Sequence, residues 1–95
     1  MNDRRSERFR DILAEVEQTI GKRLAHRIAI YVLKERTRMS VPMVADEAGS
    51  ATNDHAMLAL VWTRKEMERD SKFADKVRRL VKKDPAEAGR VHLAR

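Results

Sequence analysis

Hydrophobic side chains recur at steps of three and four along most of the chain, which is the spacing of one face of an α-helix. Residues that cap or break helices divide this pattern into separate segments. We therefore expect an all-α fold, a single compact domain of about five short helices. The expected helices cover residues 6–20, 22–37, 41–48 and 53–69, and a fifth from Ser71 to the Asp84–Pro85 pair.

The length of the chain sets its domain organisation. A core built by 95 residues cannot be divided and stay stable, so we expect residues 1–95 to form one domain, with loosely ordered ends at 1–5 and 86–95. The sequence has no cysteine, which excludes disulfides and thiolate metal sites. It has no secretory signal core and no apolar run of about 18 residues, so cytoplasmic localisation without membrane contact is the default expectation.

Segment 22–37 is the most apolar of the expected helices, with hydrophobic side chains on more than one face. Such a helix is buried on several sides. It is therefore either the centre of the core, packed by helices 6–20 and 53–69, or part of a dimer interface. A second apolar run contains Trp62, which we interpret as a core or interface anchor. The candidate dimer or partner interface comprises Ile28, Tyr31, Val32 and Trp62.

Two expected helices meet at a glycine-containing corner within residues 41–63. Ala45 and Gly49 have the spacing by which a helix-turn-helix motif lets its two helices approach closely. Ser50 and His55 depart from that motif, because they fall where it normally has apolar residues. The corner is either a DNA-reading device or a plain helical hairpin with a glycine cap, and the sequence leaves both interpretations open.

If the corner reads DNA, the first turn of helix 53–69 should approach the groove. Asparagine can make a bidentate contact to adenine, and histidine can donate to an edge of guanine. Asp54 argues against this role, because a carboxylate facing the groove is repelled by the phosphates. The candidate base contacts are Thr52, Asn53 and His55.

The net charge of +6 is unevenly distributed. Residues 22–38 carry six Lys and Arg against one acid, residues 64–83 carry nine against four, and the corner carries three acids and no Lys or Arg. Basic blocks attract polyanions, most often nucleic acid, although a basic helix face can also be merely solvated. The candidate phosphate contacts are Arg36, Arg38, Arg64, Lys65, Lys72, Lys76, Arg78, Arg79, Lys82 and Lys83.

Catalytic chemistry has little support in the sequence. His26, His55 and His92 are scattered and lack the i, i+4 spacing of a helical metal pair. The three glycines are isolated, and each falls where a helix would end, so they do not make a loop that cradles phosphate. We therefore expect no catalytic site, no metal and no cofactor.

The function that best fits these patterns is a small basic DNA-binding protein, a transcriptional regulator of the kind that phages, plasmids and operons use. It would be a homodimer, with the corner near the groove and the flanking basic helices on phosphates. The competing hypothesis is a helical protein-interaction module, such as an antiactivator, inhibitor or assembly adaptor, acting through the apolar faces of helices 22–37 and 53–69. RNA binding without sequence reading is a third alternative.

Overall fold

The computed structural model describes residues 4–50 and 52–82, in which the chain forms five α-helices and no strand. The predicted all-α fold of one compact domain is confirmed. Residues 1–3, 51 and 83–95 lie outside the described part of the chain, and with them the expectations for Lys83, for the end of the fifth helix at Asp84–Pro85, and for loosely ordered residues 1–3 and 86–95. The helices are α1 (Glu7–Thr19), α2 (Ala25–Thr37), α3 (Val41–Glu47), α4 (Asn53–Arg69) and α5 (Ser71–Lys82).

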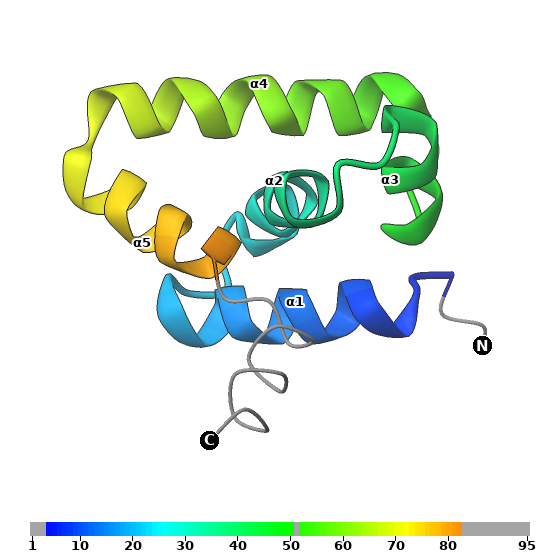
Figure 1. The fold of residues 1–95 in the computed structure, drawn as a ribbon, viewed down its shortest axis with the longest axis horizontal. Coiled ribbons are helices and arrows are strands. Elements are labelled where there is room, and N and C mark those ends of the chain that lie inside the picture. The colour runs from blue at the N-terminus through cyan, green and yellow to red at the C-terminus, as the bar shows by residue number, and fades with distance from the viewer. Residues whose placement is uncertain (1–3, 51, 83–95) are drawn as a thin grey trace, which may run out of the picture.

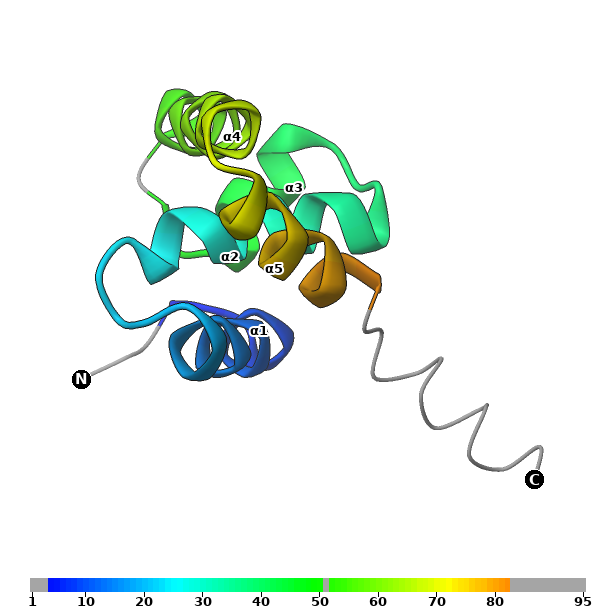
Figure 2. The ribbon, with the colours of Figure 1, turned by 90° about the vertical axis from the view of Figure 1, so that its left-hand side faces the viewer.

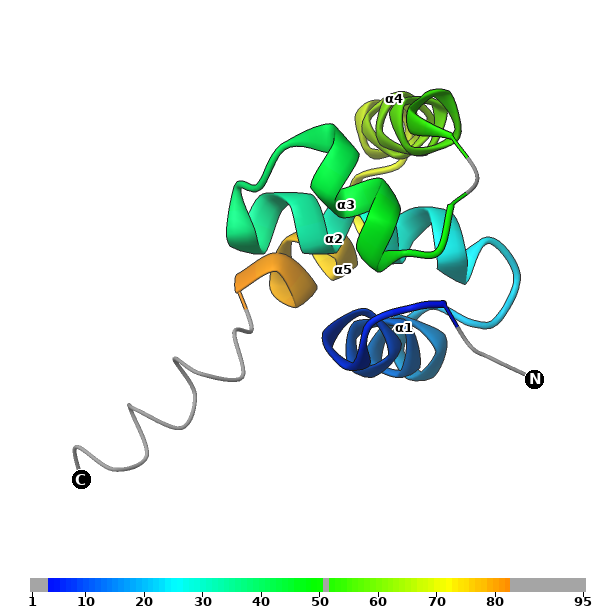
Figure 3. The same cartoon turned by 90° about the vertical axis from the view of Figure 1, so that its right-hand side faces the viewer.

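α2 lies at the centre of the molecule, and the other four helices pack around it. In Figure 1, α2 is seen end-on between α4 and α1. Figures 2 and 3, turned by 90°, show α1 and α4 end-on instead, so these two helices cross α2 on opposite sides. α3 packs beside the start of α4 and α5 beside its end, and both also contact α2.

The side chains of α2 form the middle of the core, because they are buried on more than one side of the helix. Ile28, Ile30, Val32 and Leu33 are each at most 2% exposed. This burial agrees with the interpretation of the segment as the central core helix. It also removes Ile28 and Val32 from the candidate dimer interface, since neither side chain reaches the surface of the single chain.

α2 begins three residues later than the hydrophobic pattern predicts. The predicted start is Lys22, whereas the helix begins at Ala25. Its N-cap residue, Leu24, has a φ of 66°, in the left-handed region that a right-handed helix cannot include. Residues 22–24 instead form a turn between α1 and α2, and hydrophobic periodicity does not reveal such a break.

The corner between α3 and α4 has the glycine cap that the sequence predicts. Gly49, with a φ of 68°, donates its backbone N–H to the carbonyl oxygen of Asp46 at 3.1 Å. Ser50 donates to the carbonyl oxygen of Ala45 at 2.9 Å, and the two bonds close a Schellman motif at the end of α3. A Cβ at Gly49 would lie 3.1 Å from Cγ of Arg5, so a larger residue would have to shift that side chain, and the positive φ favours glycine in any case.

Arg36 ties three helices together from inside the molecule. Its guanidinium donates from Nε, at 2.9 Å, and from Nη2 to the carbonyl oxygen of Leu80 near the end of α5. Its Nη1 donates to the carboxylate of Glu15 in α1 at 3.3 Å, and only 4% of the Arg36 side chain is exposed. The predicted role of Arg36 as a phosphate contact is therefore wrong, because its donors are buried and engaged within the fold.

A second polar cluster fixes the start of α1 against the end of α3. The hydroxyl of Ser6 accepts the backbone N–H of Phe9 at 3.0 Å, which caps α1, and donates to the carboxylate of Glu47 at 2.8 Å. Arg8 donates to the same carboxylate from Nε at 3.2 Å and also from Nη2. The hydrogen bond from Arg8 lowers the pKa of Glu47, so the cluster keeps an ionised carboxylate at neutral pH.

Replacing Arg36 by methionine should lower the free energy of unfolding by about 2–3 kcal/mol. Methionine keeps much of the side-chain volume but withdraws the donors from the Leu80 carbonyl and from Glu15. Urea unfolding followed by circular dichroism measures the change. Arg10→Met is the matched control, because Arg10 is exposed on α1, and it should cost less than about 0.5 kcal/mol. Equal stability of the two variants would show that Arg36 does not anchor the fold.

Candidate nucleic-acid interface

α5 has a buried face and a basic face. Ala74, Val77 and Leu80 are buried against the core. On the solvent side, Asp75 is the one acid of this helix, and it lies 3.4 Å from a neighbouring arginine. The predicted phosphate contacts of α5 within the described residues are all exposed: Lys72, Lys76, Arg78, Arg79 and Lys82.

Arg64 and Lys65 are neighbours in α4, but their side chains leave the helix about 100° apart. Arg64 and Arg78 both act electrostatically on the phenol of Tyr31, whose pKa is raised chiefly by burial, so Arg64 lies on the side of α4 that meets α5. The Arg64 side chain is 59% exposed, and its 4.0 Å contact with Glu35 is too long and too solvated to neutralise it. Arg64 therefore extends the basic face of α5, and Lys65 does not. We call Arg64, Lys72, Lys76, Arg78, Arg79 and Lys82 the basic surface.

Of two other candidate residues, Tyr31 lies in the middle of α2 and Arg38 is the residue that caps its C-terminal end. Arg38 is exposed, and it ends the helix with a φ of 58° and a backbone N–H that donates to the carbonyl oxygen of Lys34 at 2.8 Å. Tyr31 is half-buried. Arg38 can thus reach solvent as a phosphate contact should, whereas Tyr31 offers a partner only part of its surface.

The predicted base contacts are separated from the basic surface by the length of α4. They lie at its start, whereas α5 packs beside its end (Figure 1), and 16 residue steps in a helix correspond to about 24 Å. The hydroxyl of Thr52 is engaged as the helix cap, where it accepts the backbone N–H of His55 at 3.2 Å. Asn53 is exposed, beside the equally exposed carboxylate of Asp54. The predicted reading head and the predicted phosphate contacts thus do not form one surface.

The structure brings together two histidines that look scattered in the sequence. The ring of His26 lies 5.8 Å from that of His55, with the planes 13° apart, and 5.2 Å from the ring of Phe9. Burial lowers the pKa of His26, so its imidazole is neutral at pH 7. Its Nε2 lies 3.2 Å from the carbonyl oxygen of Ala48, which fits a donated Nε2–H. These histidines meet because α2 packs against α4, and their spacing in the sequence does not predict the contact.

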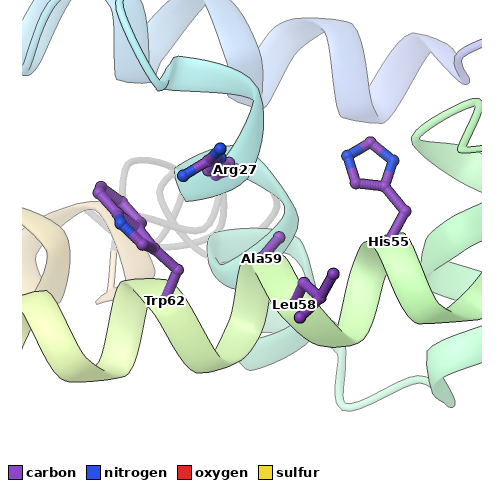
Figure 4. A pocket seen from close by; sticks show the side chains of 5 residues that line it. All are labelled: Arg27, His55, Leu58, Ala59 and Trp62. Carbon is purple, nitrogen blue, oxygen red and sulfur yellow. The ribbon is translucent and has the colours of Figure 1, made fainter.

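A cavity of about 300 Å³ opens between α2 and α4 (Figure 4). The guanidinium carbon of Arg27 lies 5.2 Å from the centre of the Trp62 ring, a cation–π contact. On another side, the Trp62 ring meets Phe73 of α5 edge-on, with the ring centres 6.3 Å apart. Trp62 is therefore a half-buried anchor at the edge of the core. The cavity is lined by Arg27, His55, Leu58, Ala59 and Trp62.

The outer face of α4 carries apolar side chains that the core does not cover. Met57 is 48% exposed, Leu58 is 69% exposed and Val61 is 42% exposed. Residues three and four apart share a helix face, so these three side chains form one row, which we call the outer stripe. The sequence shows a broad apolar run here, but a broad run does not tell which part of it faces solvent.

Within the described residues, no three His, Asp or Glu side chains stand where they could hold a metal ion. No described helix is both long enough and apolar enough to cross a membrane. Comparison of the chain with protein-family models, curated proteins and solved structures found no match. What the protein does must therefore be inferred from its exposed surfaces.

Acidification should destabilise the protein through His26. Its pKa is lowered in the folded state from the usual value of 6.5, so the unfolded chain binds the proton first as the pH falls. Stability should therefore decline as the pH falls through 6.5 and stop declining below the folded pKa. Urea unfolding at about pH 7.5 and about pH 5.5 measures the loss, which His26→Gln should abolish.

This pH range lies above the usual glutamate pKa of 4.5, and the pKa of Glu47 is lowered further in the fold by the hydrogen bond from Arg8, so that carboxylate does not contribute to the loss. Glutamine at position 26 keeps an amide donor for the Ala48 carbonyl and cannot titrate. An unchanged loss of stability in His26→Gln would assign the pH dependence to another group.

Proposed function

We propose that the protein binds duplex DNA, as small transcriptional regulators do, by contacts between the basic surface and the phosphate backbone. The observation that carries the proposal is the exposure of a continuous basic face on α5, extended by Arg64 of α4. Each of these side chains is long and ends in solvent, which suits contact with phosphates along a groove edge.

Little acidic charge offsets the basic surface. Asp75 contacts Arg78 at 3.4 Å, but both side chains are more than 60% exposed, so this pair is weak. Because Arg64 and Arg78 approach the same phenol, the charges of α4 and α5 add on one side of the molecule. A polyanion placed there would meet several cations at once and would release counterions on binding.

The same proposal predicts weak base preference. Of the three candidate base contacts, Thr52 caps α4 and His55 stacks on His26, so two of the side chains are already engaged. The exposed carboxylates of Asp46 and Asp54 make the region around the corner acidic rather than basic. Binding through the basic surface would therefore depend on the backbone of the duplex more than on its sequence.

A protein-interaction role is the second candidate, and the outer stripe favours it. Exposed apolar rows on a small protein commonly mark a contact with another protein. That row lies on α4 away from the core, whereas the basic surface is built mainly from α5. The two functions therefore use different side chains and can be tested separately.

The double substitution Lys76→Ala/Arg79→Ala should weaken binding to unrelated duplexes alike, by about tenfold at moderate salt. It should also reduce the slope of log K against log salt by about 2, since each lost phosphate contact contributes about 0.9. Fluorescence anisotropy with labelled duplexes across a salt series measures both quantities. Lys22→Ala/Arg23→Ala is the matched control, because it removes the same charge from exposed residues before α2.

If no duplex binds at low salt, or if the control pair weakens binding as much as the α5 pair, the proposed interface is wrong. Double-stranded RNA in the same titration separates the two nucleic acids, and tighter binding to RNA would replace DNA as the partner.

Asn53→Ala should leave the order of affinities among duplexes of different sequence unchanged. Asn53 is the candidate base contact with an exposed side chain that neither caps α4 nor lines the cavity. A competition assay with several unlabelled duplexes measures the preference. A loss of preference in the variant would restore the start of α4 as a reading head.

A further inference from the structure

The solvent side of α4 has an unusual symmetry in its sequence. Leu58 and Val61 of the outer stripe lie equally far from a midpoint between Ala59 and Leu60. Asp54 and Lys65 lie at equal distances beyond them, on the same face of the helix and both exposed. From its N-terminal end, this face of α4 therefore presents a negative charge, then apolar side chains, then a positive charge. From its C-terminal end the order is the same, but the two charges are exchanged.

The geometry points to a second copy of this chain as the occupant of this face, with the two α4 helices packed antiparallel about the midpoint. In this arrangement Leu58 packs against Val61 of the partner subunit. Asp54 pairs with Lys65 of the partner subunit. A two-fold axis repeats every contact, so Asp54 of one subunit meets Lys65 of the partner subunit, and the reverse pair forms as well. Each chain therefore carries both members of each pair, as an isologous interface requires.

The same register also determines how the two flanks of the α4 face would lie in the dimer. Met57 and Trp62 also lie at equal distances from the midpoint but on opposite flanks of the face, so Met57 lies on the same flank as Met57 of the partner subunit, and Trp62 on the same flank as Trp62 of the partner subunit. A second copy therefore covers the apolar row and complements the charges around it.

A different protein would need its own complementary face, whereas this chain already carries one. The exposed fractions of Met57, Leu58 and Val61, from 42% to 69%, leave enough apolar surface to make their burial favourable. The candidate interface from the sequence placed Ile28 and Val32 in this role, but both are core residues. The dimer contact thus belongs to α4 and not to α2.

The proposed dimer does not depend on DNA binding, but it would arrange the basic surfaces. Each α4 ends about ten residues from the midpoint, so the two ends, with α5 beside each, would lie roughly 30 Å apart. Consecutive turns of B-DNA are about 34 Å apart. Two basic surfaces at this spacing could contact one side of a duplex together.

Charge exchange at Asp54 and Lys65 tests the register in the absence of DNA. Sedimentation of the full chain should show a species of twice the 11.0 kDa chain mass. Asp54→Lys alone, or Lys65→Asp alone, places like charges opposite each other and should weaken self-association at least about tenfold. Mixing these two variants should restore association, because both cross-pairs are then of opposite charge.

The double variant carrying both exchanges should also dimerise, since its pairs are reversed but complementary. Asp11→Lys, at an exposed position on α1, is the control and should not change the dimer. Leu58→Gln replaces an exposed apolar side chain by a polar one that a helix accommodates well, so it should weaken association without changing the circular dichroism spectrum.

The proposal is overturned if the chain stays at 11.0 kDa at all concentrations, or if a dimer forms that neither Leu58→Gln nor the single charge variants weaken. A monomer that binds another protein through Leu58 would assign the outer stripe to that protein instead. These outcomes are independent of the salt titration, so loss of the dimer and loss of DNA binding can be told apart.

Discussion

The burial of α2 on several of its sides is the constraint on which the rest of the fold depends. A chain of 95 residues can surround one helix, and α1, α3, α4 and α5 do so, each with one of its faces. Residues 4–50 and 52–82 supply no further layer that covers the outer faces of these four helices. Those faces must be solvated or covered by a partner, and they carry both the basic surface and the outer stripe.

The charged residues divide according to whether the fold uses them. Arg36 donates hydrogen bonds to the Leu80 carbonyl and to Glu15, and Arg8 donates to Glu47, so both arginines hold helices together. The exposed cations of α5 have no comparable partner other than Asp75 beside Arg78. A high count of basic residues therefore overstates the charge available to a ligand, and five of the exposed cations lie on α5.

The corner between α3 and α4 has the local structure of a turn between two closely packed helices, but its surroundings are acidic. Its glycine cap and the Thr52 cap account for the residues that suggest a DNA-reading device. In the arrangement we propose, Asp54 pairs across a dimer interface and the phosphates are met by α5. The acidic charge near the corner then has a role that base reading could not give it.

The sequence by itself determined the helices and most of their ends, because caps and hydrophobic spacing act between near neighbours. Gly49, Thr52 and the bounds of α4 follow from such local rules. The sequence also showed that α2 and α4 are broadly apolar. It did not show that the aliphatic side chains of α2 are buried while Leu58 of α4 faces solvent. That difference, like the burial of Arg36 and the meeting of His26 with His55, was decided only by the tertiary structure. Burial depends on side chains from distant parts of the chain, and the hydrophobic periodicity within one helix does not reveal which side chains those are.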